Sequence, residues 1–134
     1  LTQADNYQAE ISEFRRDKSA FNNHLANDGF NFVSFQSDRP FQIVKFEHFL
    51  TQQLPNNIFR AKGILWFQES PARHIFQLSG SRYDLQDDDW TSQPKNELVF
   101  IGRNLDESLI KQQLNDCLAE LVVRNKFGLP NLPW

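Results

Sequence analysis

The stretch ELVFIGRNLDESLIKQQLNDCL, residues 97–118, predicts a buried strand, a tight turn and an amphipathic helix in immediate succession. Its apolar run LVFI, residues 98–101, has no polar interruption, which is typical of a strand that is covered on both faces. Gly102 follows, where a residue without a Cβ lets the backbone turn. We therefore expect a central strand here and a helix packed against the sheet directly after it.

The helix of this stretch is expected to begin after Asp106, whose carboxylate can cap it. Glu107 adds negative charge in the first turn, where the helix dipole favours it. Leu105 and Ile110 have the spacing of a hydrophobic staple around that cap. An apolar stripe then repeats at helical spacing, formed by Ile110, Leu114, Cys117, Leu118 and Leu121.

Size and composition limit the possible classes of protein. The 134 residues suffice for one domain, and 13 Phe and 3 Trp supply large core side chains. A net charge of −3 gives no electrostatic reason to expect a nucleic acid or an anionic membrane as partner. No apolar run is long enough to span a bilayer, and no signal-peptide pattern is present. Cys117 is the only cysteine, which excludes an internal disulfide and fits a reducing, cytoplasmic location.

The organisation along the chain predicts one domain with two flanking segments. Methionine is absent even at position 1, so we expect a piece of a longer protein rather than a removed initiator. Residues 1–28 are expected to form a linker that is flexible or partly helical, because Asn pairs interrupt a weak helical pattern. The apolar positions of that pattern are Tyr7, Ile11, Phe14, Phe21 and Leu25. Residues 29–123 are expected to form the domain and residues 124–134 an extended tail.

Within the domain, apolar patterning and turn residues define the elements. We expect a helix at 43–54 and strands at 30–36, 58–67, 74–79, 82–85 and 98–101. The acidic run 87–89 is expected to be a solvated loop. The strand–helix–strand start predicts a right-handed parallel crossover. Together these elements predict an α+β two-layer sandwich, in which a mixed sheet of four to five strands carries two helices on one face in a ferredoxin-like arrangement.

No catalytic or metal-binding motif is found in the sequence. It lacks a phosphate loop, a GxSxG elbow and a GxGxxG turn. His24, His48 and His74 are expected on the linker, a helix and a strand, and none has a second ligand at metal spacing. Cys117 is expected to be a small buried apolar residue rather than a reactive thiol. We therefore expect no catalytic, cofactor-binding or metal site in this chain.

Basic side chains provide the main candidates for an interaction site. Arg60 and Lys62 lie two residues apart on one strand and must point the same way, and Arg103 ends the buried strand. The three cations can converge on an anion or on an acidic surface of a partner. The alternative is that they cap strand ends and pair with carboxylates inside the domain. Trp66, expected in the core, and Asp106 complete the set of candidates.

Three segments resemble one known family. RAKGILWF (60–67), ELVFIGRNLDESLIKQQLNDCL (97–118) and SFQSDRPF (34–41) resemble signature segments of the C-terminal domain of the CobW family, over about residues 29–120. The combination of KGxxW with LVFIGRxLD is specific. The chain is most similar to the cobalamin-synthesis type, which implies a bacterial source.

The resemblance implies a P-loop GTPase as parent, with a nucleotide domain followed by this smaller domain. The family is associated with delivery of cobalt and zinc and, by kinship, nickel. Its GTPase loop and CxCC metal motif belong to the N-terminal domain, and of its histidine-rich loop only His24 is present here. GTP, Mg and a transition metal are thus implied for the parent and no cofactor for this chain.

The function implied is that of a non-catalytic accessory domain. It would contact its own N-terminal GTPase domain or a metalloprotein client. The alternative is a free-standing small-molecule or metal-binding module, which requires a pocket with convergent polar groups. An independent enzyme is the least supported hypothesis, because the sequence offers no nucleophile–base pair.

Overall fold

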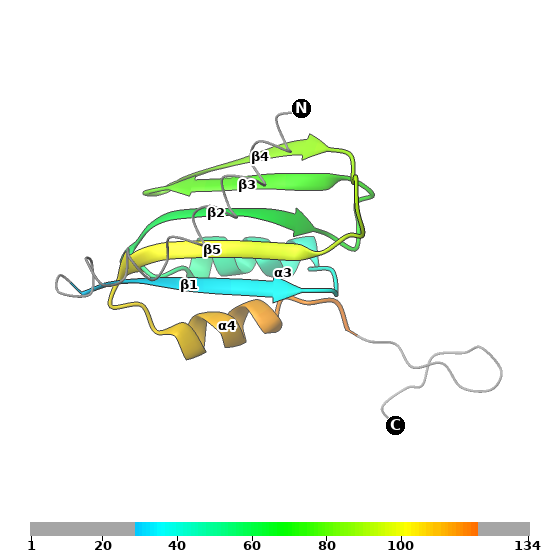
Figure 1. Cartoon of the computed structure of the whole chain (residues 1–134). Helices are drawn as coiled ribbons and strands as arrows, with labels where there is room; N and C mark the ends of the chain where they lie inside the picture. Colours follow the sequence, from blue (N-terminus) through cyan, green and yellow to red (C-terminus); the bar gives the residue numbers. More distant parts are fainter. Residues whose placement is uncertain (1–28, 121–134) are drawn as a thin grey trace, which may run out of the picture.

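A computed structural model of the chain describes residues 29–120, which form a five-stranded sheet and two short helical segments (Figure 1). The expected linker 1–28 and tail 124–134, together with Leu121, lie outside the described residues. In chain order the elements are β1 Phe30–Ser37, α3 Ile43–His48, the π-helical turn η2 Phe49–Gln53, β2 Ile58–Trp66, β3 Arg73–Ser79, β4 Arg82–Asp88, β5 Asn96–Arg103 and α4 Glu107–Asn115. No helix within residues 29–120 is long and apolar enough to cross a membrane.

The strands lie in the order β1-β5-β2-β3-β4, as Figure 1 shows. The expected α+β fold is confirmed, but the sheet is antiparallel at each of its four pairings rather than mixed. β1 and β2 run parallel to each other, as the expected crossover requires, but they are not neighbours, because β5 lies between them and pairs antiparallel with both. Phe100 of β5 faces Val33 on one side and Ala61 on the other. The most apolar strand thus takes the place where both its edges and both its faces are buried.

Both helices cover one face of this sheet. A single core cluster joins Phe46 of α3 and Leu114 of α4 to Val33, Leu65 and Leu98 of three strands. All five side chains are at most 2% exposed. This layer is the expected two-layer sandwich, in which one side of the sheet is sealed by helices.

The unit at residues 97–118 folds as expected. The Leu109 amide donates to Asp106 Oδ1 at 3.1 Å, which confirms the cap. Leu105 and Ile110, the expected staple pair, are 7% and 0% exposed within the core cluster. The helix ends at Asn115, earlier than the apolar stripe suggested, and Cys117 and Leu118 of the stripe are buried beyond its end.

Phenylalanine forms much of the helix-side core. The Phe46 ring lies 5.0 Å from that of Phe41, 6.0 Å from Phe49 and 5.8 Å from both Phe67 and Phe76, as measured between ring centres. Such packed pairs add about 0.5–1.5 kcal/mol each beyond their buried area.

The expected helix 43–54 is instead α3 followed by the wider turn η2. Ile43, expected on the buried face, is 37% exposed, whereas Phe46 and Phe49 are buried. The Ile43 amide is bound by the Glu69 carboxylate at 3.1 Å, which holds the first turn at the margin of the core.

The acidic run is not a loop, which corrects the sequence-based expectation. Asp87 and Asp88 are the last two residues of β4, which is longer than the expected 82–85. Their register places them opposite His74 and Arg73. The His74 ring contacts Asp87 at 2.8 Å and the Arg73 guanidinium contacts Asp88 at 3.3 Å. The cross-strand ion pair of Arg73 with Asp88 and the hydrogen bond of His74 with Asp87 extend the strand through residues that would otherwise favour a loop.

Candidate interaction surface

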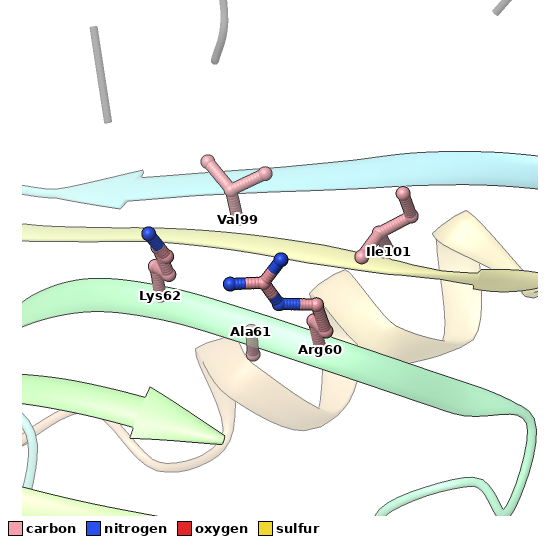
Figure 2. A pocket seen from close by; sticks show the side chains of 5 residues that line it. All are labelled: Arg60, Ala61, Lys62, Val99 and Ile101. Atoms are coloured by element: carbon pink, nitrogen blue, oxygen red, sulfur yellow. The ribbon is translucent and has the colours of Figure 1, made fainter. Parts of the chain in front are cut away.

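The expected cationic residues lie on the face of the sheet opposite the helices. Arg60 and Lys62 of β2 alternate with Ala61, which faces the helix-side core. Figure 2 shows Arg60 and Lys62 on the same side of the sheet as Val99 and Ile101 of β5, with Ala61 on the other side. The sequence prediction that the two basic residues share a face is therefore confirmed.

Apolar side chains form the floor between these cations. Phe32, Ile64, Ile75 and Val99 make a second core cluster, and Trp90 and Ile101 pack against it. Four strands contribute to this floor. The face of the sheet that carries it, opposite the helices, is called the second face from here on. The sequence-based search missed it, although the run GILWF and the aromatic alternation of 30–36 were its signals, because residues from separate strands meet only after the sheet forms.

Arg103 lies at one end of the second face, where β5 ends beside the start of β1. Its guanidinium stands over the Phe30 ring, 4.7 Å from the ring centre. Phe30 in turn contacts Phe59 with 5.4 Å between ring centres. Arg103 remains exposed, so the stack orients a cation that can still meet a partner.

The backbone at this end is unusually close-packed, which explains Gly102. A Cβ on Gly102 would lie 2.1 Å from the Asn57 carbonyl oxygen and 2.9 Å from Ile58 Cα. Gly102 therefore serves close approach between β5 and the start of β2, whereas the left-handed residue of the following turn is Asn104, with φ 54°. The Arg103 amide donates to the same Asn57 oxygen at 3.0 Å, which places the arginine at the strand end.

The other two candidates have clear structural roles. The Asp106 carboxylate accepts the capping hydrogen bond of α4. Trp66, expected in the core, is only half-buried at the end of β2. Its amide donates to Oδ1 of the fully buried Asn96 at 2.7 Å, and Asn96 Nδ2 donates to the Arg39 carbonyl at 2.8 Å. Asn96, not predicted from the sequence, thus connects three segments of the fold.

Three hydrogen-bonded side chains on the helix side of the sheet are connected in the order of a serine-hydrolase triad: Ser70, His74 and Asp87. Nε2 of His74 lies 2.9 Å from Ser70 Oγ, and its Nδ1 lies 2.8 Å from Asp87 Oδ1. The Asp87 side chain is 75% exposed, and Ser70 Oγ also accepts from the Ala72 amide at 3.3 Å within a turn. In a catalytic triad the carboxylate is buried, unlike that of Asp87, and a hydrolase site also needs hydrogen-bond donors that point at the oxyanion. We therefore interpret the hydrogen-bonded side chains of Ser70, His74 and Asp87 as a structural clamp that joins the turn at 68–72 to β4.

Beside this clamp lies an open pocket of about 320 Å³. Its lining is largely apolar, with Ile43, Leu50 and Leu85 among its residues, and Glu47, His74 and Asp87 contribute polar groups. Within residues 29–120, no three His, Cys, Asp or Glu side chains come together as a possible metal-ligand set.

Burial sets the chemistry of the only cysteine. Burial raises the pKa of the Cys117 thiol to about 11, and the neighbouring Asp116 charge acts in the same direction while Lys45 opposes it. The thiol lies 3.2 Å from the Gln113 carbonyl and 3.4 Å from that of Lys45. It is held as a neutral, buried group.

Comparison with known proteins identifies the family. Residues 30–118 match the family described as cobalamin synthesis protein CobW C-terminal domain. The fold is similar to the crystal structure of the Zn(II)-bound YjiA GTPase from E. coli, with a TM-score of 0.59 and 25% sequence identity over 68% of this chain. A Zn(II)-bound triple mutant of YjiA GTPase gives the same values. The match spans only 30% of the YjiA chain. Since the family match covers most of its length, the chain belongs to the CobW C-terminal domain family.

Proposed function

We propose that this chain is the accessory domain of a CobW-type GTPase involved in metal delivery, and that it acts by contact with the GTPase domain or with a metalloprotein client. The observation that carries this proposal is the similarity of residues 30–118 to a family domain that, in YjiA, forms part of a GTPase chain. YjiA is Zn(II)-bound, which supports a metal-related role for the parent. The parent would use GTP, Mg and a transition metal, and would be a bacterial, cytoplasmic protein.

The contact surface we propose is the cationic end of the second face. Arg60 and Arg103 are exposed, and Arg103 is oriented by Phe30. An exposed guanidinium with a fixed direction suits a carboxylate on a partner surface. The partner would therefore present acidic side chains to this end of the sheet.

The test compares the isolated chain with a full-length parent. Arg103→Ala is expected to alter GTP turnover in the parent while leaving the fold of the isolated chain intact. Arg82→Ala is the matched control, because Arg82 is an exposed strand arginine at the far edge of the sheet. Normal turnover in the Arg103→Ala parent, together with a large loss of melting temperature in the isolated variant, would contradict the docking role.

A second test concerns nucleotide. The isolated chain is expected neither to bind nor to hydrolyse GTP, because its sequence contains no glycine-rich phosphate loop. Micromolar affinity for GTP by calorimetry would contradict the assignment as an accessory domain.

The pocket beside β4 supports a second candidate, a small-molecule or metal-binding module. Its volume of about 320 Å³ and its largely apolar lining lie within the range of ligand pockets. Titration of the isolated chain with Zn²⁺ or Co²⁺ tests the metal form of this candidate. Saturable binding that is lost in His74→Ala would favour the module over the accessory domain.

A further inference from the structure

β4 forms an open edge of the sheet. It pairs with β3, and no strand within residues 29–120 lies along its other edge. Its first six residues are all exposed, and Figure 1 shows the strand on the opposite side of the sheet from α4. Alternate residues of an edge strand direct their backbone N–H and C=O groups away from the sheet, where another chain can pair with them. β4 therefore offers a template for an added strand.

The pocket of about 320 Å³ lies beside this edge on the helix side. Tyr83 and Leu85 of β4 line it together with Ile43 of α3 and Leu50 of η2. Tyr83 is 49% exposed, Leu85 is 40% exposed and Ile43 is 37% exposed. Exposed apolar side chains that are grouped in one pocket and have polar groups around them are typical of an interaction site. A strand added to β4 would place alternate side chains over this pocket, because the side chains of a strand alternate between its two faces.

The charge at this edge indicates the kind of partner. Glu47 of α3 and Asp87 of β4 line the pocket, and the Asp87 side chain is 75% exposed although it contacts the His74 ring. Asp84 is exposed on the other face of the same strand. A second copy that paired through its own β4 would bring two acidic strands together, which the repulsion of like charges disfavours. A basic segment would instead gain from the same carboxylates.

We propose that β4 binds an extended segment of a partner protein as an antiparallel sixth strand of the sheet. Opposite Tyr83 and Leu85 the segment would carry apolar side chains that enter the pocket. Opposite Asp84 and Asp87 it would carry basic side chains, because opposite charges stabilise cross-strand pairs. The inference does not depend on the proposed function, since it uses neither the GTPase domain nor the cationic end of the second face.

The test measures binding of a fluorescein-labelled peptide, Thr-Lys-Thr-Val-Lys-Val-Thr, whose seven residues match the length of β4 and this register. Fluorescence anisotropy with the full chain is expected to show saturable binding with a Kd below about 1 mM. Methylation of the alternate backbone amides that face β4 removes hydrogen-bond donors and keeps the side chains. It is expected to weaken binding at least about tenfold. A peptide with Glu in place of Lys should also bind more weakly, by a factor that shrinks in high salt.

Variants of the chain locate the binding site. Leu85→Lys removes an apolar contact and repels the basic peptide, so it is expected to weaken binding at least about tenfold. Leu109→Lys is the matched control, since Leu109 is 46% exposed on α4. Glu47→Gln is a milder change, expected to weaken binding about two- to fivefold, and Glu107→Gln on α4 is its control. Both controls should bind the peptide as the wild type does, and circular dichroism must show an unchanged sheet in each variant.

Four results would overturn the proposal. The first is the absence of saturable binding up to about 1 mM peptide. The second is equal binding of the methylated peptide, which would favour the small-molecule candidate for this pocket over an edge that pairs with a strand. The third is an equal loss of binding in Leu85→Lys and Leu109→Lys, which would place the peptide elsewhere. The fourth is a wild-type dimer in sedimentation that Leu85→Lys dissociates, which would make a second copy the occupant of β4.

Discussion

The guanidinium of Arg103 lies 4.7 Å from the centre of the Phe30 ring, so the last residue of β5 is stacked on the first residue of β1. The two residues are also paired in the strand register. The contact orients the cation without burying it. Arg103 can therefore be removed at small cost to the fold, which is what a residue that serves a partner requires.

Arg103→Ala is expected to lower the free energy of unfolding of the isolated chain by only about 0.5–1 kcal/mol, the range for an exposed cation–π contact. Arg103→Lys should retain part of that contribution, because the positive charge remains above the ring. Urea unfolding measures both. A loss above about 2 kcal/mol in the alanine variant would identify Arg103 as an internal strut.

Replacement of Leu114 tests how much the packing between α4 and the sheet contributes to stability. It is fully buried, so Leu114→Ala should reduce the free energy of unfolding by about 2–5 kcal/mol through lost burial and an internal cavity. Leu109→Ala on the same helix is the control, because its side chain is 46% exposed. The control should change stability by less than about 0.5 kcal/mol. Equal losses in the two variants would contradict the packing described for α4.

The strand–turn–helix unit could be predicted from the sequence because its determinants are local. The apolar run before Gly102, the cap at Asp106 and the spacing of Leu105 and Ile110 all act within a few residues. Alternation along β2 likewise placed Arg60 and Lys62 on one face. Each of these predictions needed only one segment of chain.

The remaining features depend on contacts between distant segments. The position of β5 between β1 and β2 depends on which strands pair, and local patterns do not specify a partner. Asp87 becomes a strand residue only when the β3–β4 register brings it to His74. The floor of the second face combines Phe32, Ile64 and Ile75 from three strands, so the apolar signals in separate stretches of sequence did not indicate that these residues meet.

Gly102 is expected to be the least replaceable glycine described. In Gly102→Ala the new Cβ would meet the Asn57 oxygen at 2.1 Å, and backbone cannot move aside as a side-chain tip can. Overpacking of this kind costs about 1–3 kcal/mol or more, which thermal unfolding would show. Gly80→Asn is the control, because Gly80 has φ +61° with no atom within 4 Å of a new Cβ, and Asn tolerates that conformation. A normal melting temperature in Gly102→Ala would show that the β5–β2 approach is looser than described.

Cys117 should react slowly with thiol reagents and should make stability fall at alkaline pH. Burial raises the folded pKa to about 11 from an ordinary value of 9.0, so at pH 8 the buried thiol is almost entirely protonated. Between these two pKa values the unfolded chain loses the proton first and therefore binds fewer protons than the folded chain. Stability from this group is thus complete below pH 9 and declines as pH rises towards 11.

Comparison with Cys117→Ala isolates this effect from the lysines and tyrosines that titrate in the same range. Urea unfolding from pH 8 to 11 should show a steeper decline for the wild type than for the variant, although the variant starts from a lower stability because it loses a buried side chain. Modification by a thiol reagent at pH 8 should be slow in the folded wild type and fast in urea. Parallel pH profiles together with rapid modification of the folded chain would show that Cys117 is accessible and ionises as an ordinary thiol.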